Sequence, residues 1–283
     1  MTSTHDYLMF FTNTGKAHRI KAYEIPEANR NAKGVPAVNF LNLMQRERIT
    51  AVIPIKEYSE DSYLIGVTKN GTIKKTALSN FDTARKTGII AMNLKDDDQL
   101  VDIKETSGHD NVIIVTKHGK CISFSEHDVR PMGRIAGGVR AIKLEGDDEV
   151  VSMELVQPGQ ELFVVTTKGY GKRTPVKEYK IQVRGGKGLL TYDKSKFKKT
   201  GELVGAVAVN EDDEIMLINS DGIIIRIEAK DVTVLGRATQ GVKIMKVAED
   251  TDIISVAKVI KDDEPKEATI GENEDGQIII TTK

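Results

Sequence analysis

The chain has 283 residues, of which 39% are hydrophobic and 29% charged, and its formal net charge is -1. This composition is typical of a globular protein with a sizeable core, and no apolar run reaches the roughly 18–20 residues that a membrane span needs. With a single cysteine, Cys121, the chain cannot form an internal disulfide. We therefore expect a soluble cytoplasmic protein with no membrane partner.

Five β-rich runs follow one another along the chain, and each leads into a turn that contains glycine. They are Tyr7–Thr12, Tyr63–Thr68, Val112–Thr116, Leu162–Thr167 and Ile215–Ile218. Two of the turns are Asn70-Gly71 and Asp221-Gly222, which are strong hairpin signals. After each turn we expect a second strand such as Ile223–Ile227, then a polar basic loop that ends at a second glycine.

A third and a fourth strand complete each unit, separated by an acidic turn. The third strands include Val139–Leu144 and Val242–Val247, and the fourth strands include Val150–Val156, Leu203–Val209 and Ile253–Val259. The run Val112–Val115 is apolar without alternation, which is typical of a strand covered on both faces.

These units form an internal repeat of about 50 residues. The turn glycines lie 48 to 56 residues apart, and the second glycines 50 to 54 residues apart. The two sets are Gly15, Gly71, Gly119, Gly169 and Gly222, and Gly34, Gly88, Gly138, Gly188 and Gly241. Four strands per repeat predict an all-β, propeller-like array of four-stranded blades, because stacked blades bury faces that one sheet would leave exposed. The chain has no Trp, so it cannot be a WD-type propeller.

We predict one domain over residues 1–261, with repeats near 6–58, 62–107, 111–158, 161–210 and 214–261. Residues 262–276 carry seven acids against one base, so we expect 262–283 to be an acidic, disordered tail that ends in a strand-like segment. That segment, Ile278–Lys283, resembles a first strand with no turn after it. We therefore expect the chain to be a piece of a longer protein.

The basic loops share a fixed pattern. An Arg precedes the second glycine by four residues in four repeats, at Arg30, Arg134, Arg184 and Arg237, and Arg85 stands three residues before Gly88. Residues 168–188 hold seven bases and one acid. Because blades are equivalent around an axis, the loops predict a ring of positive charge. The usual meaning of one cationic loop is a solvated surface, but recurrence on every repeat favours an anionic partner.

Signals for catalysis or metal binding are poor. The five histidines and Cys121 show no metal-ligand spacing, and 185–188 lacks the leading glycine and the Ser/Thr of a phosphate-binding loop. We expect no catalytic residue, no metal site and no cofactor in this chain.

The segment Gln182-Val183-Arg184-Gly185-Gly186-Lys187-Gly188 resembles the GyrA-box, Gln-Arg-Arg-Gly-Gly-Lys-Gly, with Val183 in place of the first Arg. The phrases at 6–12, 128–134 and 169–175 also resemble the GyrA-box β-pinwheel family, the C-terminal DNA-wrapping domains of the bacterial DNA gyrase A subunit. The resemblance implies a propeller-like β-pinwheel whose blades exchange strands, normally with six blades, of which five repeats are visible here. Because the family's box lies in the first blade, 182–188 is a second, box-like loop on a later blade.

The resemblance also implies a function. The family wraps duplex DNA around its outer rim with little sequence specificity, and presents a crossing segment to the cleavage core so that the enzyme introduces negative supercoils. The implied whole enzyme is an ATP-dependent type II topoisomerase that uses ATP and Mg²⁺. Its implied partners are the N-terminal cleavage core and the gyrase B subunit in an A2B2 heterotetramer, in the bacterial cytoplasm at the nucleoid.

From the loops and the resemblance together we expect a set of DNA-contacting residues. They are Gln182, Arg184, Gly185, Gly186, Lys187, Gly188, Arg30, Lys33, Arg85, Lys86, Arg130, Arg134, Arg140, Lys172, Arg173, Arg237 and Lys243. The alternatives are the related domain in the A-type subunit of topoisomerase IV, which serves decatenation, a protein-interaction propeller, and a propeller enzyme with its site at the central channel.

Overall fold

The computed structural model describes residues 2–28, 32, 34–83, 85, 88–95 and 97–259, and the backbone of two strands, β20 (Ala268–Glu272) and β21 (Ile278–Thr282). Over these ranges the chain is built of β-strands, with short 3-10 turns and one helix, α1 (Phe197–Thr200). The expected disordered tail otherwise falls outside the described residues.

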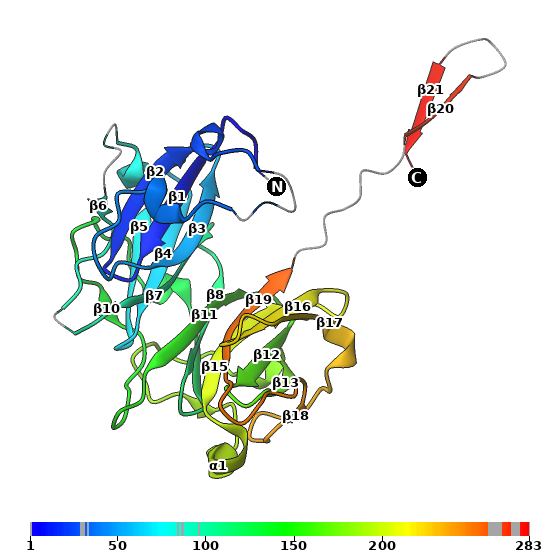
Figure 1. Ribbon diagram of the computed structural model, residues 1–283. Helices are drawn as coiled ribbons and strands as arrows, with labels where there is room; N and C mark the ends of the chain where they lie inside the picture. Colours follow the sequence, from blue (N-terminus) through cyan, green and yellow to red (C-terminus); the bar gives the residue numbers. More distant parts are fainter. Residues whose placement is uncertain are drawn as a thin grey trace.

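Five antiparallel sheets follow one another as blades (Figure 1). Their first and second strands are β1 (Tyr7–Thr12), β2 (Lys16–Lys21), β4 (Tyr63–Thr68), β5 (Thr72–Ala77), β8 (Asn111–Thr116), β9 (Lys120–Ser125), β12 (Glu161–Thr166), β13 (Tyr170–Pro175), β16 (Glu214–Asn219) and β17 (Ile224–Glu228). Their fourth strands are β3 (Ile49–Ile55), β7 (Leu100–Thr106), β11 (Val150–Val156), β15 (Leu203–Val209) and β19 (Ile253–Val259). The prediction of an all-β array of blades is confirmed.

The blades exchange strands. Four sheets have the orders β3-β1-β2-β6, β10-β5-β4-β7, β11-β8-β9-β14 and β15-β12-β13-β18. In each of them the outermost strand comes from the next repeat, and we call these the exchange strands: β6 (Ile89–Ile90), β10 (Val139–Arg140), β14 (Leu189–Leu190) and β18 (Val242–Lys243). The fifth sheet, β17-β16-β19, has three strands within the described residues.

The exchange strands are shorter than the predicted third strands. The pattern predicts one strand over Val139–Leu144, but pairing stops after Arg140. The reason is that the backbone N–H groups of Ala141 and Ile142 both turn to the carbonyl oxygen of Gly71, at 2.8 and 3.4 Å. Both side chains are thereby buried between two blades, where they contribute to the core instead of to the sheet edge.

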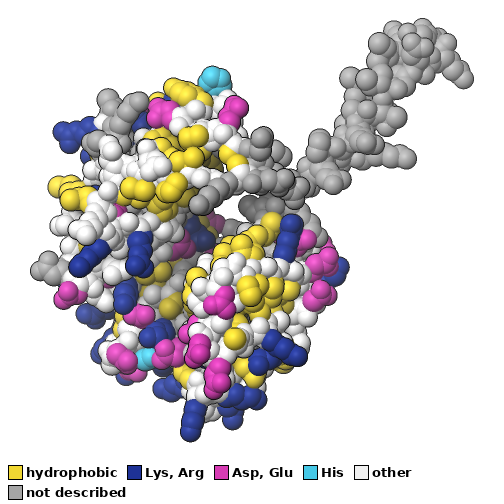
Figure 2. All heavy atoms as spheres, in the orientation of Figure 1, with side chains coloured by type: hydrophobic (Ala, Val, Ile, Leu, Met, Phe, Trp, Pro, Cys, Tyr) yellow, Lys and Arg dark blue, Asp and Glu magenta, His cyan; other side chains and the backbone are white. Residues whose placement is uncertain are grey.

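The hydrophobic core lies between blades. Alternate residues of the apolar run 112–115 serve two separate clusters, since Val112 and Ile114 pack with the second blade whereas Ile113 and Val115 pack with the fourth. All four side chains are fully buried, as expected for a strand covered on both faces. By contrast, Ile223, Ile224 and Ile254 of the fifth blade are exposed, and Figure 2 shows apolar side chains gathered there.

The fourth strands line the inside of the array, and one backbone hydrogen bond recurs at each step between blades. The first N–H of the fourth strand donates to the carbonyl of the turn in the preceding blade, as from Leu100 to Asn13 at 2.9 Å and from Val150 to Lys69 at 2.9 Å. The acidic turns lie at the same edge. The acid that immediately precedes the fourth strand pairs with a lysine of the preceding blade in three cases, Lys69–Glu149 (2.7 Å), Lys117–Glu202 (3.2 Å) and Lys168–Asp252 (3.0 Å).

Candidate nucleic-acid interface

The basic loops reach the outer edge of the array because each must cross to the preceding blade before its exchange strand begins. We call residues 129–138, 179–188 and 232–241 the exchange loops. Each runs parallel to the second strand of the preceding blade, at the bridges Lys75 to Pro131, Ser123 to Ile181 and Arg173 to Val234. Backbone hydrogen bonds fix this position, such as Gln182 N–H to the carbonyl of Ser123 at 2.7 Å.

Each exchange loop ends at a glycine, because two backbones approach there too closely to leave room for a side chain. Gly138, Gly188 and Gly241 have φ of +88°, +69° and +77°. A β-carbon there would lie 2.6, 2.5 and 2.6 Å from the carbonyl oxygen of the residue opposite, which is Ile73, Cys121 and Gly171 respectively. In these three repeats the second glycine therefore marks the crossing point of strand exchange.

The exchange loops are also joined to one another. Asn93 N–H donates to the carbonyl of Ala136 at 3.4 Å, Lys143 N–H to Gly186 at 2.8 Å, and Asp193 N–H to Thr239 at 3.2 Å. Each of these bonds links the segment that follows one exchange strand to the next exchange loop. The outer rim is thus one continuous hydrogen-bonded track instead of a set of independent loops.

The predicted site residues that the structure describes fall into three groups, which are exposed, half-buried and buried. The exposed members are Arg85, Arg130, Arg140, Lys187 and Lys243; the half-buried members are Gln182, Arg134, Arg184, Gly185, Gly186, Gly188 and Arg237. Arg30, Lys33 and Lys86 lie outside the described residues. The remaining two, Lys172 and Arg173, are buried.

Within the box-like loop, both cationic side chains have partners in the protein. The Arg184 guanidinium donates through Nε to the carbonyl of Asp128 at 2.8 Å and through Nη1 to the carbonyl of Arg140 at 2.9 Å. Lys187 Nζ lies 2.7 Å from Glu145 Oε1, and this carboxylate raises the pKa of Lys187. Lys187 is exposed, so a phosphate can reach it, but it must displace Glu145.

Burial corrects the assignment of Lys172 and Arg173 to the DNA-contacting set. The Lys172 side chain is fully buried and its ammonium donates to the carbonyl of Gly236 at 2.6 Å, to the carbonyl of Arg237 and to Thr239 Oγ1 at 3.0 Å. Burial lowers its pKa to about 7. Arg173 donates to the carbonyl of Val232 at 2.9 Å and pairs with Glu161. Both residues lie on β13, whose two faces are covered by neighbouring blades, and neither can contact DNA directly.

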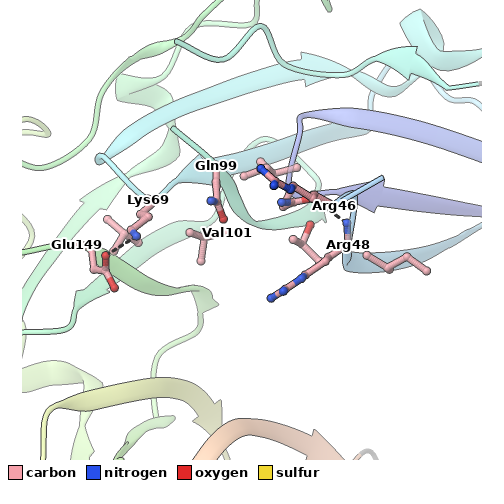
Figure 3. A pocket seen from close by; sticks show the side chains of 11 residues that line it. Arg46, Arg48, Lys69, Gln99, Val101 and Glu149 are labelled. Carbon is pink, nitrogen blue, oxygen red and sulfur yellow. Dashed lines mark hydrogen bonds and ion pairs between the residues drawn. The ribbon is translucent and has the colours of Figure 1, made fainter. Parts of the chain in front are cut away.

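A groove near the inner edge was not expected from the sequence. It encloses about 700 Å³, and Arg46, Arg48, Lys69, Gln99 and Glu149 are among its lining residues. Figure 3 shows the two arginines on one side and the Lys69–Glu149 pair on the other. Arg48 stands at the position in the first repeat that Glu149 holds in the third. The Arg48 carbonyl accepts a hydrogen bond from Asn13 N–H, and the Glu149 carbonyl accepts one from Lys117 N–H, each in the turn after the first strand of its repeat. The first repeat thus replaces the acidic turn by a basic one.

Neither a metal centre nor a membrane span is found in the part of the chain that the structure describes. That part contains no group of three or more His, Cys, Asp or Glu side chains arranged to hold a metal ion. None of its helices has the length and apolar character to cross a membrane.

The sequence of the chain is similar to one protein family and to curated proteins that share one name. The family described as "DNA gyrase C-terminal domain, beta-propeller" matches residues 6–56, 62–107, 110–157, 160–210 and 213–261. The chain is 44% identical over 270 residues to the DNA gyrase A subunit of Mycolicibacterium smegmatis, covering 94% of this chain and 32% of the relative. It is 50% identical over 263 residues to the DNA gyrase A subunit of Clostridium acetobutylicum, covering 93% of this chain and 31% of the relative. The chain therefore spans about a third of the length of these relatives.

Two solved structures share the fold. The structure called "Crystal structure of the C-terminal domain of DNA topoisomerase IV" superposes with a TM-score of 0.84 at 29% identity, covering 90% of this chain and 80% of that one. "Structure of DNA gyrase A C-terminal domain" superposes with a TM-score of 0.79 at 32% identity, covering 92% of this chain and 84% of that one. With the repeat, the exchanged strands and the match over all five blades in place, the chain belongs to the family of DNA gyrase C-terminal β-propeller domains.

Proposed function

We propose that this chain binds duplex DNA along its outer rim and bends it, with little sequence preference. The observation that carries this proposal is the continuity of the rim. The exchange loops occupy equivalent places on successive blades and are hydrogen-bonded to one another. The loops and the exchange strands that follow them carry exposed cations, such as Arg130 in a loop and Arg140 and Lys243 on β10 and β18. A duplex that follows the loops meets one cationic segment per blade along a curved path.

A distributed site suits the mechanical cost of bending. DNA has a persistence length of about 150 bp, so turning roughly 40 bp through a half circle costs on the order of 10 kcal/mol in a smooth elastic estimate. One basic patch cannot offset that cost, but phosphate contacts on several blades can, through neutralisation and counterion release. Such contacts position the DNA backbone without reading bases, so sequence preference should be weak.

The wider role of the domain follows from its relatives' names. We propose that it works in a gyrase-type enzyme, where wrapping presents a crossing DNA segment to the cleavage core and leads to negative supercoiling. Relatives named as the A subunit of DNA gyrase favour this role over decatenation by topoisomerase IV. In this proposal the partners are the cleavage core and the gyrase B subunit in an A2B2 assembly at the bacterial nucleoid, and ATP and Mg²⁺ serve those other parts of the enzyme.

One observation favours a second candidate function, a rim that binds protein. Ile135 and Val183, on neighbouring exchange loops, are 73% and 79% exposed. Exposed apolar side chains that form a contiguous patch mark contact sites for another protein. This candidate predicts that replacing Ile135 or Val183 by Ser weakens binding to a protein partner such as the cleavage core and leaves DNA bending unchanged.

Fluorescence energy transfer between the ends of a short duplex, measured over a salt series, tests the DNA proposal. We expect efficient transfer at low salt and a steep loss of binding as salt rises. Neutralising Arg140 or Lys243 should each reduce the slope of log affinity against log salt by about one. The control is Lys56→Ala, which removes an exposed cation between β3 and β4, away from the exchange loops. A salt-independent affinity, or equal effects of rim and control variants, would contradict the proposal.

A further inference from the structure

Two buried lysines occupy the same place in blades two and four. Lys74 on β5 and Lys172 on β13 each follow the turn glycine by three residues, and they are 3% and 0% exposed. Lysine is among the residues least often buried completely, because transfer of its ammonium out of water is costly unless hydrogen bonds replace the hydration. The partners of these two ammonium groups therefore indicate what the side chains do.

Both ammonium groups bind the backbone of the exchange loop that crosses over them. Lys74 Nζ donates to the carbonyls of Ala91 at 2.6 Å, Gly133 at 3.2 Å and Ala136 at 3.3 Å, and also to the carbonyl of Arg134. Lys172 Nζ donates to Gly236 and Arg237 in the matching stretch two repeats later. In both loops the lysine ammonium donates to the backbone carbonyl of the recurrent arginine, which is Arg134 in one loop and Arg237 in the other.

The blade between them provides an internal comparison. Ile122 stands at the matching position on β9 and cannot bind a carbonyl. The exchange loop above it is the box-like loop, where Arg184 itself donates to the carbonyls of Asp128 and Arg140. In this blade, which lacks the buried lysine, an arginine of the loop itself donates hydrogen bonds to backbone carbonyls.

We propose that Lys74 and Lys172 are positioning residues, whose ammonium groups gather the carbonyls of residues 133–136 and 236–237 and so hold these two exchange loops in the conformation that presents their cations to DNA. The DNA part of this inference rests on the proposed function, whereas the anchoring of the loops does not. Without the ammonium, the carbonyls aimed at one point would lose their common donor, and those of Gly133, Ala136 and Gly236 would keep only their bonds from Ala136 N–H, Asn93 N–H and Thr239 Oγ1. The loop would then turn those carbonyls towards water and lose its fixed shape.

Hydrogen exchange in the isolated chain tests the anchoring without DNA. Lys172→Met removes the charge and keeps a similar length, and we expect amide exchange to rise about tenfold or more over residues 233–244 and to stay unchanged over 130–142. Lys74→Met should give the reverse pattern. The control, Lys177→Met, removes an exposed lysine of the same repeat and should alter neither segment.

The proposal is tested by which segments show faster amide exchange in each variant. Unchanged exchange in both variants, or an increase spread over all blades, would overturn the proposal. If Lys172→Met does not fold, Lys172→Ile reproduces the residue that the intervening blade carries at Ile122, and Lys74→Met is an independent test at the second site.

Energy transfer on end-labelled duplex then tests the consequence for DNA. We expect Lys74→Met and Lys172→Met to lower the bent fraction at least about twofold, with Lys177→Met close to the unaltered chain. If the unaltered chain fails to bend DNA, the proposed function is refuted. The hydrogen-exchange result still tests the anchoring of the loops, because it needs no DNA. Loosened loops together with an unaltered bent fraction would overturn the positioning role.

Discussion

Replacing Gly188 by Ala should disrupt strand exchange, and the structure supplies both the magnitude and a control. Gly188 has φ +69°, and a β-carbon there would lie 2.5 Å from the Cys121 carbonyl oxygen and 3.0 Å from its carbon. Gly222 has φ +80°, but its β-carbon would meet nothing within 4 Å. Comparing the two variants therefore separates the cost of positive φ from the cost of steric overlap.

The expected costs differ by more than the error of a denaturation experiment. Positive φ costs a non-glycine residue about 1–2 kcal/mol, and Gly222→Ala should lose no more than that. Gly188→Ala must in addition move β14 away from β9, which breaks the pairing of Leu189 with Cys121 and of Leu190 with Lys120. At about 1 kcal/mol for each lost hydrogen bond, we expect a total of about 3–4 kcal/mol.

Urea unfolding of the unaltered chain and the two variants measures these differences. We also expect Gly188→Ala to lower the DNA-bent fraction, because the box-like loop is displaced with β14, whereas Gly222→Ala should leave bending unchanged. Equal losses of unfolding free energy in the two variants would refute the idea that Gly188 is required by backbone approach.

Three further predictions concern charge. Burial alone would raise the pKa of Glu47, but hydrogen bonds from Met44 N–H, Thr12 and Thr14 hold it at about 2, below the ordinary 4.5. Its contribution, about 3 kcal/mol, is present above pH 4.5 and should be lost as pH falls towards 2, so urea unfolding at about pH 6 and pH 3 should show a smaller decrease for Glu47→Gln than for the unaltered chain. Arg184→Ala combined with Lys187→Ala should lower the bent fraction more than the affinity, judged by energy transfer against mobility shift, and total loss of binding would make 182–188 the principal site. Asp252→Asn should cost less than about 1 kcal/mol in thermal unfolding, because the side chains of Lys168 and Asp252 are 38% and 50% exposed and water screens their pair; a larger cost would mean that ion pairs hold the blades together.

The sequence predicts the parts of the fold that depend on local pattern. The fourth strands Val150–Val156, Leu203–Val209 and Ile253–Val259 have the bounds expected from their apolar pattern, and the turn glycines lie where the hairpins turn. The exchange strands β10 and β18 begin at Val139 and Val242 as predicted, but the residues at which they end could not be predicted in the same way. They pair over only two residues each, and their partner lies in another repeat, so no local periodicity marks them.

The sequence did not predict which cationic side chains point outward and which point into the core. Lys172 and Arg173 lie in a basic stretch of sequence that predicts a surface position, but β13 is covered on both faces and both side chains turn inward. Lys74 and Lys75 on β5 are buried likewise. The sequence did contain a signal, because these lysines and arginines stand within predicted second strands and not in the exchange loops, where Arg130 and Lys187 are exposed.

The most direct test of DNA wrapping is the linking number of a plasmid closed in the presence of the chain. A nicked circle is ligated with increasing amounts of protein, deproteinised and resolved into topoisomers. Because wrapping in one hand gives the bound DNA a chiral path, we predict a shift of the topoisomer distribution in one direction that grows with bound protein and disappears at high salt, where phosphate contacts are lost. An unshifted distribution at saturating protein and low salt would show that the rim binds DNA without wrapping it, and would contradict the proposed function.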